Sequence, residues 1–163
     1  MDIYLGLGSN LGDRESQLRA ALTSLNNNGV RVVRSASVYL TEPRDYADQP
    51  WFLNTVVQAD TELEPQDLLQ RCLRIEREAG RNRTTPNGPR TLDIDIVFYA
   101  DRVIDLPGLT IPHPRYAGRR FVLEPLAEIA PNLIDPKRGV RVRDLLEQSS
   151  DDAVISVYGR PLL

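Results

Sequence analysis

The sequence predicts an α+β fold, in which an antiparallel sheet carries helices on one face and is followed by a C-terminal extension. Four segments are rich in β-branched and aromatic residues, and two segments between them repeat apolar residues three or four positions apart. Clusters of Gly, Pro and Asn separate these segments. The resulting order is β-α-β-β-α-β, which is the ferredoxin-like arrangement.

The first half of the chain supplies two predicted strands and the first predicted helix. Residues 2–8 (DIYLGLG) are expected to form a strand, and residues 13–27 a helix with Asp13 as its N-cap. Residues 30–40 (VRVVRSASVYL) are predicted to be a single strand, because valine recurs along them. A polar loop with two prolines, TEPRDYADQP at 41–50, follows that strand.

The second half completes the pattern. Residues 52–61 (FLNTVVQADT) predict the third strand. The second helix should begin near Pro65, which suits a first helical turn, and end at Gly80, a good stop signal. After a loop at 81–89, residues 92–100 (LDIDIVFYA) predict the fourth strand.

The chain length of 163 residues predicts one domain with a sizeable core. We expect the pattern above to belong to a core at about residues 1–136, and residues 137–163 to form a C-terminal extension. Two further short helices are predicted, one at about 120–129 and one near 143–149.

The composition indicates a cytoplasmic protein without a membrane partner. The N-terminus, MDIYLGLGSN, lacks the pattern of a signal peptide, and no apolar run reaches the roughly 18 residues needed to span a bilayer. One cysteine, Cys72, excludes an internal disulfide framework and fits a reducing compartment. Because Cys72 falls on the apolar stripe of the second helix, we expect it to be a small buried hydrophobe.

The charges are unevenly distributed, although the net charge is only −3. Residues 81–120 contain seven arginines and four aspartates, so this segment is positive within an acidic protein. A local basic zone suits a small anionic ligand better than a nucleic-acid backbone, which requires a broad basic face. Lys137 is the only lysine, so any phosphate must be bound by arginines and metal ions.

Two acids lie two residues apart in the fourth predicted strand. Alternate residues of a strand project from the same face, roughly 7 Å apart. Asp93 and Asp95 should therefore project together, while Ile94 and Ile96 face the core. Such a pair of carboxylates can hold two magnesium ions, with substrate phosphates as further ligands. The alternative is a half-exposed strand that carries ordinary surface acids.

Three arginines precede these acids. Arg81 and Arg83 follow the second predicted helix, and Arg90 comes just before the strand. Their position suggests a mobile clamp that closes over phosphates held by the aspartates. Taken in isolation, a solvated charged loop explains the same residues.

Two other features invite a functional interpretation. His113, the only histidine, lies between prolines in IPHPR, and lone histidines are more often structural than catalytic. No cluster of Cys and His has zinc-ligand spacing. The stretch GLGSNLG fits neither of the two common glycine-rich nucleotide loops. We therefore interpret Gly6 and Gly8 as strand glycines that allow close approach of another chain or a ligand.

Two classes of function can be compared on these residues. A metal-dependent nucleotidyltransferase or nuclease would use the same pair of acids, but it would need a third acid and a longer basic track. A ligand-sensing or RNA-binding module would explain the fold but not the acids, and an RNA-binding sheet should expose aromatic residues, which make up only 6% of the chain. Neither of these two classes accounts for both the acids and the arginines.

Seven stretches of the sequence together match the pattern of a known enzyme family. They are GSNLGDR (8–14), YLTEP (39–43), DQPWFLNTVV (48–57), IEREAGRNR (75–83), GPRTLDIDI (88–96), IPHPR (111–115) and RRFVLEPLAEIAP (119–131). Through them, roughly residues 3–136 resemble the 6-hydroxymethyl-7,8-dihydropterin pyrophosphokinase family of folate biosynthesis. The most specific part is GPRTLDIDI followed by IPHPR.

The resemblance implies a reaction and its partners. Such an enzyme transfers pyrophosphate from ATP to the hydroxymethyl group of 6-hydroxymethyl-7,8-dihydropterin and releases AMP, with two Mg²⁺ ions as cofactors. Its partners would be these two small molecules, without nucleic acid, and we expect a monomer.

The resemblance also implies roles for individual residues. Asp93 and Asp95 would hold the metal ions and, with Arg81 and Arg90, form the catalytic set. The pterin ring would stack between two phenylalanines. The implied ATP-binding residues are Arg81, Arg83, Arg90, Ile96, Thr110, His113 and Arg119, and the implied pterin-binding residues are Asn10, Thr41, Pro43, Phe52, Asn54 and Phe121.

Overall fold

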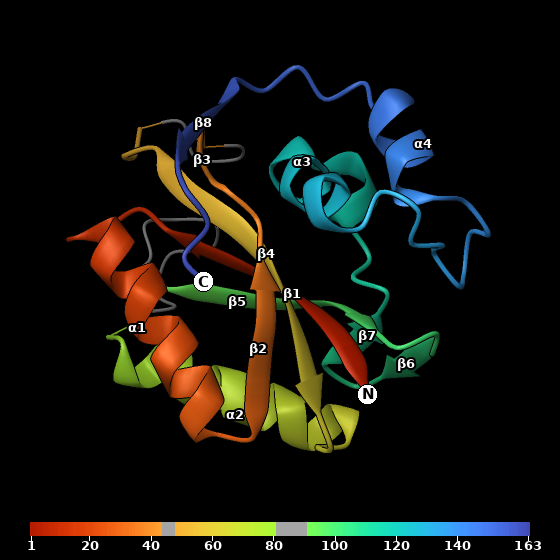
Figure 1. The fold of residues 1–163 in the computed structure, drawn as a ribbon, viewed down its shortest axis with the longest axis horizontal. Helices are drawn as coiled ribbons and strands as arrows, with labels where there is room; N and C mark the ends of the chain where they lie inside the picture. Colours follow the sequence, from red (N-terminus) through yellow and green to blue (C-terminus); the bar gives the residue numbers. More distant parts are fainter. Residues whose placement is uncertain (44–47, 81–90) are drawn as a thin grey trace.

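A computed structural model describes residues 1–43, 48–80 and 91–163. It contains a six-stranded sheet, a two-stranded sheet and four α-helices, arranged as Figure 1 shows. The strands are β1 (Asp2–Ser9), β2 (Val30–Ser35), β3 (Val38–Thr41), β4 (Phe52–Thr61), β5 (Asp93–Tyr99), β6 (Ile104–Leu106), β7 (Leu109–Ile111) and β8 (Ile155–Gly159). The helices are α1 (Arg14–Asn27), α2 (Pro65–Glu78), the 3-10 turn η1 (Tyr116–Gly118), α3 (Arg120–Ile129) and α4 (Val142–Glu147).

The large sheet has the strand order β5-β1-β4-β3-β8, and β2 also pairs with β4. Neighbouring strands are antiparallel throughout. From β1 to β5 the observed order is β-α-β-β-β-α-β, which is the predicted β-α-β-β-α-β order with one predicted strand divided in two. This order places β1 in the middle of the sheet, between β4 and β5, so that residues of all three strands can meet on one face.

The prediction of a single strand at 30–40 was wrong, because the chain forms two strands there. Ala36 and Ser37 interrupt the pairing, and their two carbonyl oxygens accept the hydroxyl of Thr55 at 3.1 and 3.0 Å. A side chain of β4 therefore stabilises the interruption. As a result, β2 pairs with one end of β4 and β3 pairs with the other.

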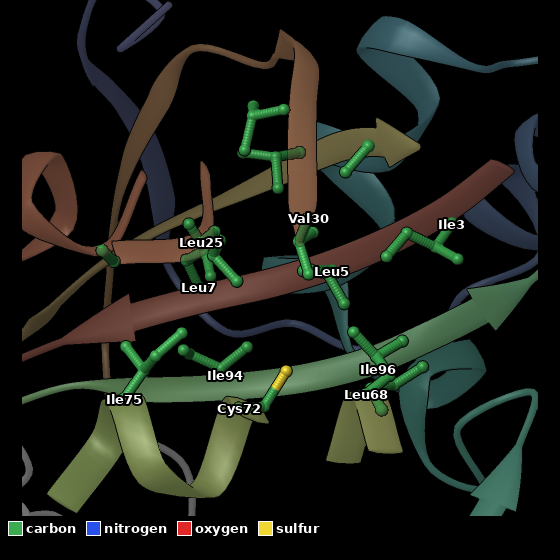
Figure 2. Packing of buried hydrophobic residues seen from close by; sticks show 14 of the residues in the cluster. Ile3, Leu5, Leu7, Leu25, Val30, Leu68, Cys72, Ile75, Ile94 and Ile96 are labelled. Atoms are coloured by element: carbon green, nitrogen blue, oxygen red, sulfur yellow. The ribbon is translucent and has the colours of Figure 1, made fainter. Parts of the chain in front are cut away.

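The sheet has an apolar core on each face, because successive strand residues point to opposite sides. Ile3, Leu5 and Leu7 of β1 pack under α1 and α2 in the first core (Figure 2). Tyr4 points the other way, into a second core formed with α3 and α4. The helices within the predicted pattern thus share one face, while helices from later in the chain cover the other.

The helix ends follow the predicted signals. The carboxylate of Asp13 accepts the Ser16 N–H at 3.1 Å, which confirms Asp13 as the N-cap of α1. Helix α2 begins at Pro65 and ends before Gly80, whose φ of +85° favours glycine. Cys72 is buried in the first core, as predicted, and burial raises the pKa of its thiol to about 12.

Residues 137–163, which were predicted to form a C-terminal extension, contain α4 and β8. The helix predicted near 143–149 spans Val142–Glu147. Strand β8 was not predicted, and it pairs antiparallel with β3 at the edge of the sheet. Farther on, Leu162 packs against the first core and the Leu163 N–H donates to the Ser35 hydroxyl at 2.9 Å. None of the helices in the described ranges has the length and apolar character needed to cross a bilayer.

A buried carboxylate, Asp135, organises the connection between α3 and α4. Its side chain is 0% exposed. It accepts hydrogen bonds from the Tyr116 hydroxyl, from the backbone N–H groups of Lys137 and Arg138, and from the Arg138 guanidinium. Burial alone would raise the pKa of Asp135, but these hydrogen bonds outweigh it and the pKa lies below the ordinary value of 3.8.

We expect Asp135→Asn to lower the free energy of unfolding by about 3 kcal/mol at pH 7, because it leaves donors without a buried anion. The native pKa is depressed, so the contribution of Asp135 is present above pH 3.8 and is lost as the pH falls through the native pKa. Urea unfolding of wild type and variant at pH 7 and pH 3 should show that the difference between their free energies of unfolding is smaller at pH 3. Asp101→Asn, in an exposed turn, is the matched control. If the difference in free energy of unfolding between wild type and Asp135→Asn did not depend on pH, the proposed role of the Asp135 carboxylate would be wrong.

Candidate functional site

The paired carboxylates lie on β5 as predicted. Asp93 is paired in register with Gly8 of β1, and Asp95 with Gly6. Both acids are partly exposed, whereas Ile94 between them is 6% exposed and belongs to the first core. The strand thus separates an apolar face from a face that carries two carboxylates.

The donor set on this face fits magnesium. Carboxylate oxygens are the ligands that Mg²⁺ prefers, and Mg²⁺ is usually held by one or two carboxylates together with substrate phosphates and water. Within residues 1–43, 48–80 and 91–163, no three His, Cys, Asp or Glu side chains gather as a metal site. Asp93 and Asp95 supply two carboxylates of the kind that Mg²⁺ uses together with substrate phosphates.

The glycines of β1 create space opposite the acids. A Cβ atom built on Gly8 would clash with Oδ1 of Asn54, so only glycine allows that side chain to lie against β1. A Cβ on Gly6 would make ordinary contacts, the nearest at 3.8 Å to Val97. The prediction that a strand glycine permits close approach is confirmed at Gly8, where the approaching group is a side chain of the neighbouring strand.

A pocket joins the acids to this amide. It is lined by residues of β1, β4, β5 and the first turn of α3. The lining residues are Gly6, Leu7, Gly8, Asn54, Thr55, Asp93, Asp95, Phe121 and Val122. Polar groups that differ in charge and hydrogen-bonding character therefore face one space.

The amide of Asn54 is held in a fixed orientation. Its Nδ2 donates to Oγ1 of Thr41 at 2.7 Å, and both side chains are buried. Phe52 is 9% exposed, and its ring lies beside Gly8, 3.6 Å from the position of a Cβ there. Phe121 of α3 lines the pocket itself. An amide edge and aromatic residues are therefore found together here, which suits a flat heterocycle.

Asn10 stabilises the chain just before Phe52. Its Nδ2 donates to Oε1 of Gln49 and to the carbonyl oxygen of Pro50, each at 2.9 Å. Arg14 donates to the carbonyl oxygen of Trp51 at 2.8 Å. Asn10, which follows β1, and Arg14, which begins α1, thereby hold residues 49–51 in place before Phe52.

His113 lies beside the acids. Its backbone N–H donates to the Val97 carbonyl at 3.0 Å, which holds it along β5. Its Nδ1 accepts the Arg115 N–H at 3.1 Å, so in the neutral ring Nε2 carries the hydrogen. Nε2 lies 4.0 Å from Oδ1 of Asp95.

The imidazole of His113 is neutral at pH 7. Burial lowers its pKa, the positive charges of Arg119 and Arg115 lower it further, and Asp93 acts in the opposite direction, so that the pKa is about 4. The contact between His113 and Asp95 is therefore not an ion pair at neutral pH. The Nε2–H group instead offers an uncharged hydrogen-bond donor next to the acids.

The other predicted site residues within the described ranges are Arg119, Thr110, Ile96 and Pro43. The guanidinium of Arg119 lies 5.5 Å from the centre of the Phe121 ring. Thr110 is on β7, paired in register with Asp105, and the side chain of Ile96 is in the first core rather than on the acidic face. Pro43 follows β3 and is partly buried. The predictions for Arg81, Arg83 and Arg90 concern residues outside the described ranges.

Sequence reasoning missed several residues near the site. Thr55 and Val122 line the pocket. Glu76 of α2 is 2% exposed, and its carboxylate accepts the N–H of Ile94, between the two aspartates, at 2.7 Å. A signal for Glu76 was available, because it lies four residues after Cys72 on the apolar stripe of a helix, where an acid must have a specific partner.

The known proteins that this chain resembles belong to one enzyme family. Residues 4–131 match the model of the family described as 7,8-dihydro-6-hydroxymethylpterin-pyrophosphokinase (HPPK). A 2-amino-4-hydroxy-6-hydroxymethyldihydropteridine pyrophosphokinase of Methylorubrum extorquens is 47% identical over 132 residues, which cover 80% of this chain and 84% of that protein. The enzyme of the same name from Haemophilus influenzae is 39% identical, with 94% of this chain and 96% of that protein covered.

Some relatives are much longer. The folic acid synthesis protein fol1 of Pneumocystis carinii is 38% identical over 91% of this chain, but this chain spans only 20% of its length. The crystal structure of an HPPK-DHPS protein of Plasmodium falciparum has a TM-score of 0.74, covering 90% of this chain and 45% of that one. At 15% sequence identity, this likeness concerns the fold alone.

Proposed function

Because this chain belongs to the 7,8-dihydro-6-hydroxymethylpterin-pyrophosphokinase family, we propose that it transfers pyrophosphate from ATP to 6-hydroxymethyl-7,8-dihydropterin in folate biosynthesis. AMP is the other product. The observation that carries the proposal is that Asp93 and Asp95 line one pocket together with Asn54 and Phe121. A phosphate-binding end and a heterocycle-binding end must adjoin in this way if the two substrates are to react.

The pterin occupies the amide end of the pocket. Its ring stacks between Phe52 and Phe121, and its amide and amino edge pairs with Asn54 and Thr41. The backbone at Pro43 contributes to the same edge. Asn10 keeps this wall in place through its hydrogen bonds to Gln49 and Pro50.

The triphosphate occupies the acidic end. Asp93 and Asp95 hold two Mg²⁺ ions, which when bound neutralise the phosphate charge and orient the phosphates. His113 donates from Nε2 to a phosphate oxygen as a neutral group, as its Nδ1 contact with the Arg115 N–H supports. Arg119 supplies positive charge beside Phe121, near the junction of the two substrates.

The remaining ATP contacts complete the proposal. Arg81 and Arg90 clamp the phosphates and stabilise the charge that develops during transfer, and Arg83 joins them in binding. Thr110 and Ile96 lie nearest the ribose and base. For Ile96 the contact must come from its backbone, because its side chain belongs to the core.

Release of AMP defines which bonds change. The hydroxymethyl oxygen forms a bond to the β-phosphorus of ATP, and the bond from that phosphorus to the α,β-bridging oxygen breaks. The bridging oxygen leaves with AMP, and the hydroxyl proton is lost. Such a transfer depends on positioning and charge neutralisation more than on covalent catalysis by the protein.

The described residues weigh against the two other classes of function. A nuclease or nucleotidyltransferase would need a third acid beside the pair, and the described part of the chain shows no such cluster. An RNA-binding sheet would expose its aromatic residues, whereas Tyr4, Phe98 and Tyr99 of β1 and β5 are buried. We further propose that the protein is a cytoplasmic monomer, for which the single cysteine is consistent with a reducing compartment.

The test is the identity of the nucleotide product. Purified protein is incubated with Mg²⁺, ATP and 6-hydroxymethyl-7,8-dihydropterin, and the nucleotides and pterins are separated by chromatography. We expect AMP and pterin pyrophosphate in equal amounts, and neither product when the pterin is omitted or the metal is chelated. Formation of ADP, or of free pyrophosphate with a nucleotidylated pterin, would refute the proposed reaction.

A further inference from the structure

Residues 151–159 connect two walls of the pocket that come from distant parts of the chain. The carboxylate of Asp151 accepts the N–H of Arg120, the first residue of α3, at 2.9 Å. Its other oxygen accepts the Ala153 N–H at 3.0 Å, which fixes the local turn. The N-cap residue of α3, Arg119, makes no side-chain cap hydrogen bond, so Asp151 caps this helix from 31 residues away.

The same segment is tied to the end of β3. The Glu42 N–H donates to the Val154 carbonyl at 3.1 Å, and the Val154 N–H donates to Oε1 of Glu42 at 2.9 Å. Strand β8 then continues along β3, with Ile155 paired to Thr41. The segment therefore holds α3 on one side and the strand that carries Thr41 on the other.

The two ends of α3 are attached to the sheet in different ways. At its C-terminal end, Glu128 accepts hydrogen bonds from the backbone and hydroxyl of Ser37 and from the Tyr39 hydroxyl, at 2.7 to 3.1 Å. This end is thus tied directly to β3 and its approach. The first turn, which carries Phe121, is tied to β3 through Asp151 and Val154.

We propose that Asp151 is a positioning residue for the pterin substrate, which sets the place of Phe121 across the pocket from Asn54. The inference rests on the function proposed above, because it concerns the wall that the pterin would contact. Without Asp151 the Arg120 N–H loses its acceptor, and the first turn of a helix frays when such an N–H group is left unsatisfied. Fraying would move Phe121 away from the ring that it stacks on, while the acids on β5 keep their place in the sheet.

The test compares Asp151→Ala with Asp152→Ala, an exposed neighbour with the same charge. We expect Asp151→Ala to raise the KM for 6-hydroxymethyl-7,8-dihydropterin about tenfold, with kcat and the KM for ATP within about twofold of wild type. Asp151→Asn should recover part of the loss, because its amide oxygen can still accept the Arg120 N–H. Asp152→Ala should match wild type.

Direct binding provides a readout that does not depend on turnover. Calorimetric titration with oxidised 6-hydroxymethylpterin, in the presence of Mg²⁺ and a non-hydrolysable ATP analogue, should show the same weakening for Asp151→Ala and normal binding of the nucleotide analogue. A loss that falls equally on both ligands and follows a lowered unfolding midpoint would show a purely structural role and overturn the inference. Equal behaviour of the variants at 151 and 152 would also overturn it.

The two proposals fail in different ways. If wild-type protein forms no AMP, the proposed function fails, although calorimetry still tests whether Asp151 controls the pterin wall. If wild-type protein is active and Asp151→Ala keeps its normal KM for the pterin, the positioning role alone is wrong.

Discussion

Asp95→Asn should reduce kcat by at least about 1,000-fold, a barrier increase of about 4 kcal/mol, while leaving the protein folded. The substitution keeps the shape of the side chain but removes a charged ligand from the proposed magnesium site. It also removes one of two like charges on the same face of β5, so the melting temperature should hold or rise in the absence of metal.

The measurements for Asp95 are steady-state rates over a range of Mg²⁺ concentrations, together with thermal unfolding without metal. Asp105→Asn, on the exposed part of β6, controls for the loss of one negative charge and should behave as wild type in both. A variant at 95 with near-normal kcat at ordinary Mg²⁺ concentration would show that the metal assignment is wrong. A large drop in melting temperature would show instead that the carboxylate is structural.

Gly8→Ala should raise the KM for the pterin by at least about 30-fold, because the new methyl group would clash with Oδ1 of Asn54. The side chain of Asn54 would have to rotate and give up its 2.7 Å hydrogen bond to Thr41. The free energy of unfolding should fall by about 1–2 kcal/mol, since a buried amide loses its partner in a crowded site. Substrate kinetics and urea unfolding measure the two effects.

Two comparisons make the Gly8 prediction specific. Gly6→Ala, on the same strand, places its methyl group 3.8 Å from the nearest atom and should destabilise the protein far less. In an Asn54→Ala background the added methyl group has no amide oxygen to clash with. Gly8→Ala should then lower the free energy of unfolding only slightly further. Additive costs in this double-mutant cycle would contradict the steric explanation.

The sequence was sufficient to predict the elements from β1 to β5, apart from the division of one strand into β2 and β3, and the placement of the two acids. A period of two determines that Asp93 and Asp95 share a face whatever the strand pairs with, so no tertiary information was needed. The caps of α1 and α2 are likewise local, and Asp13 and Gly80 lie where their chemistry indicates.

What the sequence did not reveal depends on pairings between distant residues. The break at Ala36 and Ser37 requires the hydroxyl of Thr55 on the opposite strand, which pattern reasoning cannot supply. The need for glycine at position 8 follows from a register that places Asn54 opposite it. Strand β8 is partly exposed, so its sequence shows little alternation, and its pairing with β3 spans more than a hundred residues of chain.

The pairing of β8 with β3 also has a consequence for biosynthesis. The acids, His113 and the first turn of α3 all lie before residue 124 in the chain, whereas the segment that holds that turn in place lies at residues 151–159. Contacts between residues far apart in sequence form late, because the chain between them must be ordered first. On a ribosome, the face that carries Asp93 and Asp95 can therefore be assembled before the wall that we propose for the pterin, and we expect that proposed wall to be complete only when β8 has joined the sheet.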